Sequence, residues 1–163
     1  MRALLNAILT TISTQAWSNT HYSGCWLGNF PPCPNSYVCD WVYKNGSNSP
    51  VWVEKNSIFL ISDQSQLKRL DRQSGELVWS IKLPYFINSS KKDRNRIIVH
   101  YGPILAGGML IVASSNGLIY TFDPQTGKNI RTISFKGGAA TNPVVSNNTL
   151  YIVTNSGELI AFN

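Results

Sequence analysis

From residue 49 onward, apolar residues occur in short runs separated by turn-forming residues, which is the pattern of an all-β protein. The run at residues 58–61 is apolar at every position, so it predicts a strand buried on both faces. Further runs at 51–53, 66–70 and 76–83 complete a predicted four-stranded unit at 49–83. Similar runs predict a second unit at 101–136 and a third at 141–163, in which a fourth strand is missing.

A motif repeats along these units. The stretch LDRQSGELVW at 70–79 recurs as FDPQTGKNIR at 122–131, 52 positions later (122 − 70). Gly117 and Gly157 are only 40 positions apart (157 − 117), which predicts an insertion in a surface loop at 84–96. Self-similarity at about 40 residues with several strands per unit is typical of propeller blades. We therefore expect an all-β fold: a β-propeller fragment of about two and a half to three four-stranded antiparallel blades, after an irregular N-terminal segment.

The motif residues have structural explanations. An Asp at the first turn position accepts hydrogen bonds from the backbone two residues on, and Gly supplies the positive φ that such a hairpin needs. The Trp that follows presents a large apolar face to a neighbouring unit. We assign structural, not catalytic, roles to the signature residues Asp71, Gly75, Trp79, Gly117, Asp123, Gly127 and Gly157.

Replacement of Gly75 by Val tests the turn assignment. A β-branched side chain strains a backbone at positive φ, so we expect Gly75→Val to lower the free energy of unfolding by about 1–3 kcal/mol. Denaturant unfolding of the two chains measures the difference, and equal stability would show that the turn is misassigned.

Residues 1–48 have another character, and we treat them as a segment separate from the blades at 49–163. They contain all three cysteines, Cys25, Cys33 and Cys39, and no sustained strand alternation. The spacing of these cysteines after His21 does not match the tight pairs of zinc sites, and an odd number leaves one thiol outside any disulfide. Residues 1–12 resemble a secretory signal with an interrupted apolar region, so cytoplasmic residence stays open. The abrupt change in composition also permits out-of-frame sequence fused to the last blades of a truncated product.

Composition and charge argue against a disordered chain, a membrane-spanning helix and a nucleic-acid-binding protein. The 163 residues are 43% apolar and 13% charged, which indicates a globular chain, and no apolar run reaches the ~18 residues of a membrane-spanning helix. The net charge is +6, and half of it lies in the insertion, where Lys91, Lys92, Arg94 and Arg96 face one acid, Asp93. Because these charges are confined to one short loop, they favour a solvated loop over a nucleic-acid-binding site.

The repeat resembles that of quinoprotein-type (PQQ-like) β-propellers, with Asp71, Ser74, Gly75, Glu76 and Trp79 matching in the first copy. Asp123, Thr126, Gly127 and Lys128 match in the second, where Arg131 replaces the Trp. Residues 57–163 are similar to the C-terminal end of the BamB family of outer-membrane assembly factors. These are periplasmic lipoproteins that form an eight-bladed ring, whose last blade is completed by the N-terminal strand.

This resemblance implies a non-enzymatic protein-binding scaffold at the periplasmic face of the bacterial outer membrane, with the β-barrel assembly machinery as partner. It implies no catalytic, cofactor or metal residue, and no family contact residue falls on a matching position. Two alternatives stay open: a fragment of a PQQ-dependent dehydrogenase, or a degenerate product without independent function. Self-association could cover the open blade edges.

Overall fold

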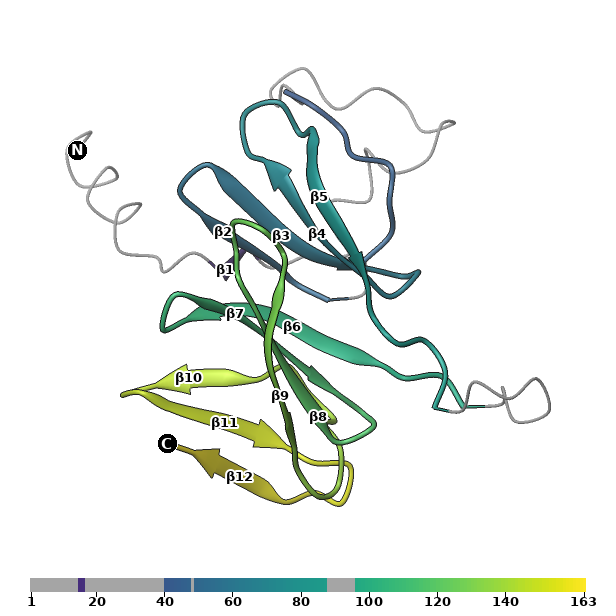
Figure 1. Cartoon of the computed structure of the whole chain (residues 1–163), viewed down its shortest axis with the longest axis vertical. Coiled ribbons are helices and arrows are strands. Elements are labelled where there is room, and N and C mark those ends of the chain that lie inside the picture. Colours follow the sequence, from purple (N-terminus) through teal and green to yellow (C-terminus); the bar gives the residue numbers. More distant parts are fainter. Residues whose placement is uncertain (1–14, 17–39, 48, 88–95) are drawn as a thin grey trace, which may run out of the picture.

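The computed structural model describes residues 15–16, 40–47, 49–87 and 96–163, which form twelve strands in three antiparallel sheets (Figure 1). These residues contain no helix, and therefore none that could cross a membrane. The predicted all-β propeller fragment is confirmed. The three cysteines, His21 and the signal-like start lie outside the described residues.

Each sheet corresponds to one blade. The first consists of β1 (Gln15–Ala16), β2 (Val51–Glu54), β3 (Ser57–Ser62), β4 (Gln66–Asp71) and β5 (Leu77–Lys82), in that spatial order. The second consists of β6 (His100–Ala106), β7 (Met109–Ser114), β8 (Leu118–Phe122) and β9 (Asn129–Ser134). The third has three described strands, β10 (Val144–Ser146), β11 (Thr149–Val153) and β12 (Leu159–Phe162).

Strand β1 lies within the segment that we expected to be irregular. It pairs with β2 of the first blade, with Gln15 opposite Trp52 and Ala16 opposite Val51. The family resemblance instead implies an N-terminal strand beside the last blade. In this structure no described strand pairs with the outer edge of β12.

Strands β6, β7 and β8 of the middle blade are largely buried on both faces, which explains their nearly continuous apolar runs, whereas β9 is exposed along its length. Because neighbouring side chains of a strand point to opposite faces, Leu110 and Val112 on β7 face the first blade, whereas Ile111 and Ala113 face the third. The cluster between the first two blades contains Phe59, Ile61, Leu67, Leu83, Leu110, Val112, Tyr120 and Phe122. The cluster between the second and third contains Ile104, Ile111, Ala113, Ile119, Ala139 and Ile152.

The blades also repeat an irregularity. The pairing register between β4 and β5 shifts between Arg69 and Leu70, and that between β8 and β9 shifts between Thr121 and Phe122, at equivalent positions of the repeat. Each shift directly precedes the Asp-x-x-Ser/Thr-Gly turn. The recurring sequence motif therefore encodes a recurring backbone geometry.

Candidate functional site

Asp71 closes the turn between β4 and β5. Its Oδ1 atom accepts hydrogen bonds from the backbone N–H groups of Gln73 at 2.8 Å and Ser74 at 2.9 Å, and Gly75 adopts φ 72°. The bond from the Ser74 backbone holds the pKa of the Asp71 carboxyl below its usual value. The carboxylate is thus used within the turn.

The turn between β8 and β9 is built in the same way. Asp123 Oδ1 accepts bonds from the N–H groups of Gln125 at 2.8 Å and Thr126 at 2.7 Å, and Gly127 also has φ 72°. The bond from the Thr126 backbone lowers the pKa of the Asp123 carboxyl.

Trp79 connects the first blade to this second turn. Its Nε1 donates to the carbonyl oxygen of Pro124 at 3.2 Å, and its ring covers Gly127 so closely that a Cβ atom there would lie 3.1 Å away. Arg69 reaches the same turn, since its Nη1 donates to Gln125 Oε1 at 2.9 Å. The turn is therefore one of the contacts that attach the second blade to the first, in addition to the apolar cluster between them.

The two remaining signature glycines lie at the opposite ends of the strands. Gly117 adopts φ 80° just before β8, and Gly157 adopts φ 81° shortly before β12. Their N–H groups donate to the carbonyl oxygens of Ser114 and Thr154, at 3.1 and 3.0 Å. The structure therefore distributes the seven signature residues over the blade turns and, for Trp79, strand β5, and does not gather them into one site.

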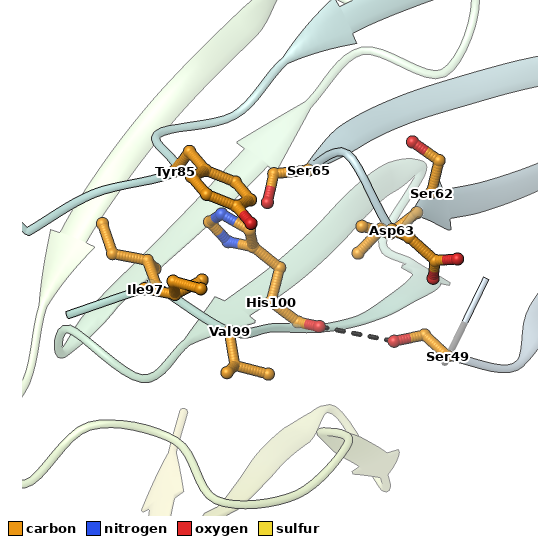
Figure 2. Close-up of a pocket in the computed structure, with 10 residues that line it drawn as sticks. Ser49, Ser62, Asp63, Ser65, Tyr85, Ile97, Val99 and His100 are labelled. Atoms are coloured by element: carbon orange, nitrogen blue, oxygen red, sulfur yellow. Dashed lines mark hydrogen bonds between the residues drawn. The ribbon is translucent and has the colours of Figure 1, made fainter. Parts of the chain in front are cut away.

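A recess of about 150 Å³ lies between the first two blades, at the end of the strands opposite to the Asp turns (Figure 2). Its polar groups come from three segments: Ser49 before β2, Asp63 and Ser65 in the loop after β3, and Tyr85 and His100 around the insertion. The rest of the wall consists of Ile61 and Ser62 on β3 and of Ile97, Ile98 and Val99, which directly follow the insertion. Ligand pockets usually measure about 300–1,000 Å³, so this recess suits a small group and not a cofactor.

His100 anchors the floor of the recess at the start of β6. Its side chain is buried, and its ring bonds Ser114 Oγ through Nδ1 at 2.6 Å and the Pro84 carbonyl oxygen through Nε2 at 2.8 Å. A carbonyl oxygen only accepts, so Nε2 carries the proton and Nδ1 accepts from the Ser114 hydroxyl. Burial lowers the pKa of His100 from 6.5, which keeps the ring neutral. Ser49 Oγ donates to the His100 backbone oxygen at 3.3 Å (Figure 2).

The hydrogen-bonded pair of His100 and Ser114 has a structural role and not a catalytic one. A serine nucleophile must reach its substrate, but Ser114 is fully buried and its hydroxyl proton is already donated to His100. Across the described ranges, no three His, Cys, Asp or Glu side chains are placed to hold a metal ion together. The residues that line the recess therefore connect the two blades, and their polar groups form a small polar surface.

The His100 geometry predicts a pH dependence of stability. Because the folded chain keeps His100 neutral while the unfolded histidine titrates near 6.5, the unfolded state binds more protons below that pH. Stability should therefore be complete above pH 6.5 and fall as the pH drops through the lowered pKa. Thermal unfolding from pH 7.5 to 5 measures this slope.

His100→Gln is the control for that slope, since Gln does not titrate and His21 is unchanged in both chains. Asp71 and Asp123 titrate below their ordinary value of 3.8, outside this window. Equal pH slopes in the two chains would contradict the assignment.

The wall of the recess continues into an apolar surface formed by the segments on either side of the insertion. Residues 84–87 and 96–99 run antiparallel, with Phe86 bridged to Ile97, and project from the body of the blades (Figure 1). Four large apolar side chains of these two segments are exposed by 37–53%: Tyr85, Ile87, Ile97 and Val99. Because Phe86 is opposite Ile97, the alternation of side chains places Tyr85 and Ile87 on one face of this ribbon and Ile97 and Val99 on the other. We call these four residues the hairpin surface. Exposed apolar side chains that form a contiguous patch mark interaction sites, whereas apolar residues scattered singly over a surface are normal.

Sequence reasoning missed two features of this region. The sequence gives His100 no role, since its partners Pro84 and Ser114 are distant in sequence and give no local signal. The region of the hairpin surface was predicted to be a basic loop, because the charged residues at 91–96 are more conspicuous in the sequence than the apolar residues on either side of them. The available signal was the pair of apolar runs at 84–87 and 97–99, which flank the charged positions of the insertion.

Comparisons with known proteins agree with this architecture. The family described as outer membrane protein assembly factor BamB matches residues 87–163. The assembly factor BamB of Legionella pneumophila is 27% identical over 118 residues, which cover 72% of this chain and 27% of that protein. The crystal structure of BamB from Moraxella catarrhalis superposes with a TM-score of 0.60 at 20% identity, covering 75% of this chain and 34% of that one. A quinohemoprotein alcohol dehydrogenase from Pseudomonas putida superposes with a TM-score of 0.54 at 16% identity, covering 76% and 20%.

The chain carries PQQ-like propeller blades similar to those of BamB, as the motif predicted. It spans about a quarter to a third of the length of the curated relatives. The likeness to the dehydrogenase shows a shared fold alone, because identity there is only 16%.

Proposed function

We propose that this chain is a non-enzymatic protein-binding scaffold in the periplasm of a bacterium, which supports the assembly of outer-membrane β-barrel proteins. The observation that carries the proposal is the BamB match over residues 87–163, together with similarity to proteins named for outer-membrane assembly. The acids of the blade turns, Asp71 and Asp123, are used within those turns and add support.

The hairpin surface is the binding region that we assign to this function. Ile97 and Val99 are exposed by 53% and 48%, and they line the recess together with its polar groups. An apolar centre with a polar rim is the usual anatomy of a protein–protein interface. The partner by resemblance is the β-barrel assembly machinery.

Complementation tests the function directly. The full chain, fused to an established export signal, is produced in a bacterium that lacks its own BamB, and the amounts of outer-membrane β-barrel proteins are measured. We expect these amounts to rise above those with empty vector. Amounts equal to the empty vector, with folded chain present in the periplasm, would contradict the proposal.

Crosslinking tests the surface. A photoreactive amino acid at position 97 should crosslink to the assembly machinery, whereas one at Lys128, exposed at the opposite end of the strands, should not. Equal crosslinking from both positions would overturn the assignment of the hairpin surface.

A titration with PQQ and Ca²⁺ addresses the dehydrogenase alternative, which requires saturable, Ca²⁺-dependent binding of PQQ to the chain.

A further inference from the structure

Ser65 occupies a backbone position at which the second and third blades have glycine. Its N–H donates to the Ser62 carbonyl oxygen at 2.9 Å, three residues earlier, as those of Gly117 and Gly157 do in their own turns. All three residues have positive φ, 54° at Ser65 against 80° and 81° at the glycines. Residues with a side chain rarely adopt this conformation, and such strained positions cluster at functional sites. The side chain of Ser65 therefore calls for an explanation.

The Ser65 hydroxyl lies in the recess between the first two blades. The residue is only 7% exposed, and Figure 2 shows its Oγ pointing toward Tyr85 and His100. Both ring nitrogens of His100 are already bonded, to Ser114 and Pro84. Among the described residues, none forms a hydrogen bond with the Ser65 hydroxyl. Because a buried polar group favours a hydrogen-bond partner, this hydroxyl is available to a group that enters the recess.

The other polar groups of the recess are chiefly acceptors, and their charge is negative. Among the described residues that line it, only Asp63 is charged, since the lowered pKa keeps His100 neutral. Unlike Asp71 and Asp123, Asp63 accepts no bond at its carboxylate from any described residue. Ser49 Oγ gives its proton to the His100 backbone oxygen, so it can only accept from a further group. An entering group must therefore bring donors and a positive charge.

The remaining wall suits a guanidinium group on an alkyl stem. Ile61 and Ile98 supply aliphatic surface, and Tyr85 supplies an aromatic ring. The recess measures about 150 Å³, a volume that takes up a molecule the size of benzene, so the end of one side chain fits. The acceptors come from separate segments and lie on different sides of the recess (Figure 2). The guanidinium group of arginine donates in several directions within one plane and stacks on aromatic rings.

The recess is also continuous with the hairpin surface. Tyr85, Ile97 and Val99 belong to both. A polypeptide that packs on these exposed side chains lies at the mouth of the recess, so that one of its own side chains can enter. A free guanidinium compound would gain none of these apolar contacts.

We propose that the recess binds an arginine side chain of a partner polypeptide that docks on the hairpin surface. Asp63 supplies the counter-charge, Ser65 accepts a hydrogen bond from the guanidinium group, and the aliphatic wall holds the stem. The proposal names the side chain that a partner inserts, and the polypeptide source of that side chain rests on the scaffold role proposed above.

An NMR titration of the isotope-labelled full chain with N-acetyl-arginine amide tests the site. We expect saturable shifts confined to the backbone amides at 63–65 and 97–100. N-acetyl-citrulline amide has the same shape without the charge and should bind about tenfold more weakly. Equal affinities for the two compounds, or no saturable shift with the arginine compound, would overturn the proposal. Tighter binding of N-acetyl-lysine amide would contradict the assignment to a guanidinium group.

Two variants locate the bound group. Asp63→Asn removes the charge at nearly constant size. Ser65→Gly removes the hydroxyl and introduces the residue that the other blades have there, so the fold is retained. Each should weaken binding by about fivefold or more. Glu76→Gln, which changes an exposed acid at the opposite end of the strands, is the control and should leave the affinity unchanged. Wild-type affinity in Asp63→Asn and Ser65→Gly would overturn the proposal.

The titration contains no partner protein, so its outcome is separate from that of the complementation experiment. Arginine binding without complementation would contradict the envelope role and leave the site intact. Complementation without arginine binding would contradict the site and leave the envelope role intact.

Discussion

Trp79→Ala is expected to lower the free energy of unfolding by about 3 kcal/mol, the usual cost of truncating a packed Trp. The substitution removes the ring that covers Gly127 and the bond to the Pro124 carbonyl oxygen. It also removes the contact with Phe59, whose ring centroid lies 6.1 Å from that of Trp79. Denaturant unfolding of the purified chain measures the loss.

Val78→Ala is the matched control for Trp79. Val78 is the preceding residue of β5 and is 51% exposed, so its truncation should change stability by at most about 0.5 kcal/mol. Equal losses in the two variants would mean that the attachment of blades through Trp79 is wrong.

Gly117→Ala should cost about 3 kcal/mol, whereas Gly157→Ala should cost about 1 kcal/mol. Both glycines have nearly the same φ, 80° and 81°, so the backbone strain is common to both. A Cβ atom at Gly117 would lie 2.6 Å from the Phe135 carbonyl oxygen, whereas one at Gly157 would have no heavy atom within 4 Å. The difference isolates the close approach of the chain after β9.

Urea unfolding of both glycine variants beside the wild type measures these costs. The comparison is internally controlled, because the residues occupy equivalent repeat positions and undergo the same substitution. Equal costs at the two positions would contradict the packing of Phe135 over the 115–117 turn.

The repeat made most of the fold predictable from sequence. The predicted runs at 51–53, 58–61 and 66–70 coincide with β2, β3 and β4 to within one residue at each end. The apolar run around Phe59 and Leu60 is buried on both sides, as its composition indicated. These features follow from local alternation and turn chemistry, which the sequence contains directly.

Contacts between distant residues were not predictable in this way. Trp41 was grouped with an irregular segment because its partner Gly75 is 34 positions away (75 − 41) and no strand run surrounds it. Lys68 interrupts the β4 pattern and would be expected in solvent, yet Tyr43 and Asn45 bury it. His100 takes its role from Pro84 and Ser114, which only the fold brings together.

The packing of the blades through their apolar faces into one cooperative unit is tested most directly by thermal unfolding of the purified full chain. Far-UV circular dichroism reports the strands, and tryptophan fluorescence reports the contacts between blades that Trp79 makes. The account predicts a single sharp transition with the same midpoint in both signals. A broad, non-cooperative transition, or a fluorescence change well below the loss of strand signal, would show that the blades do not stabilise one another.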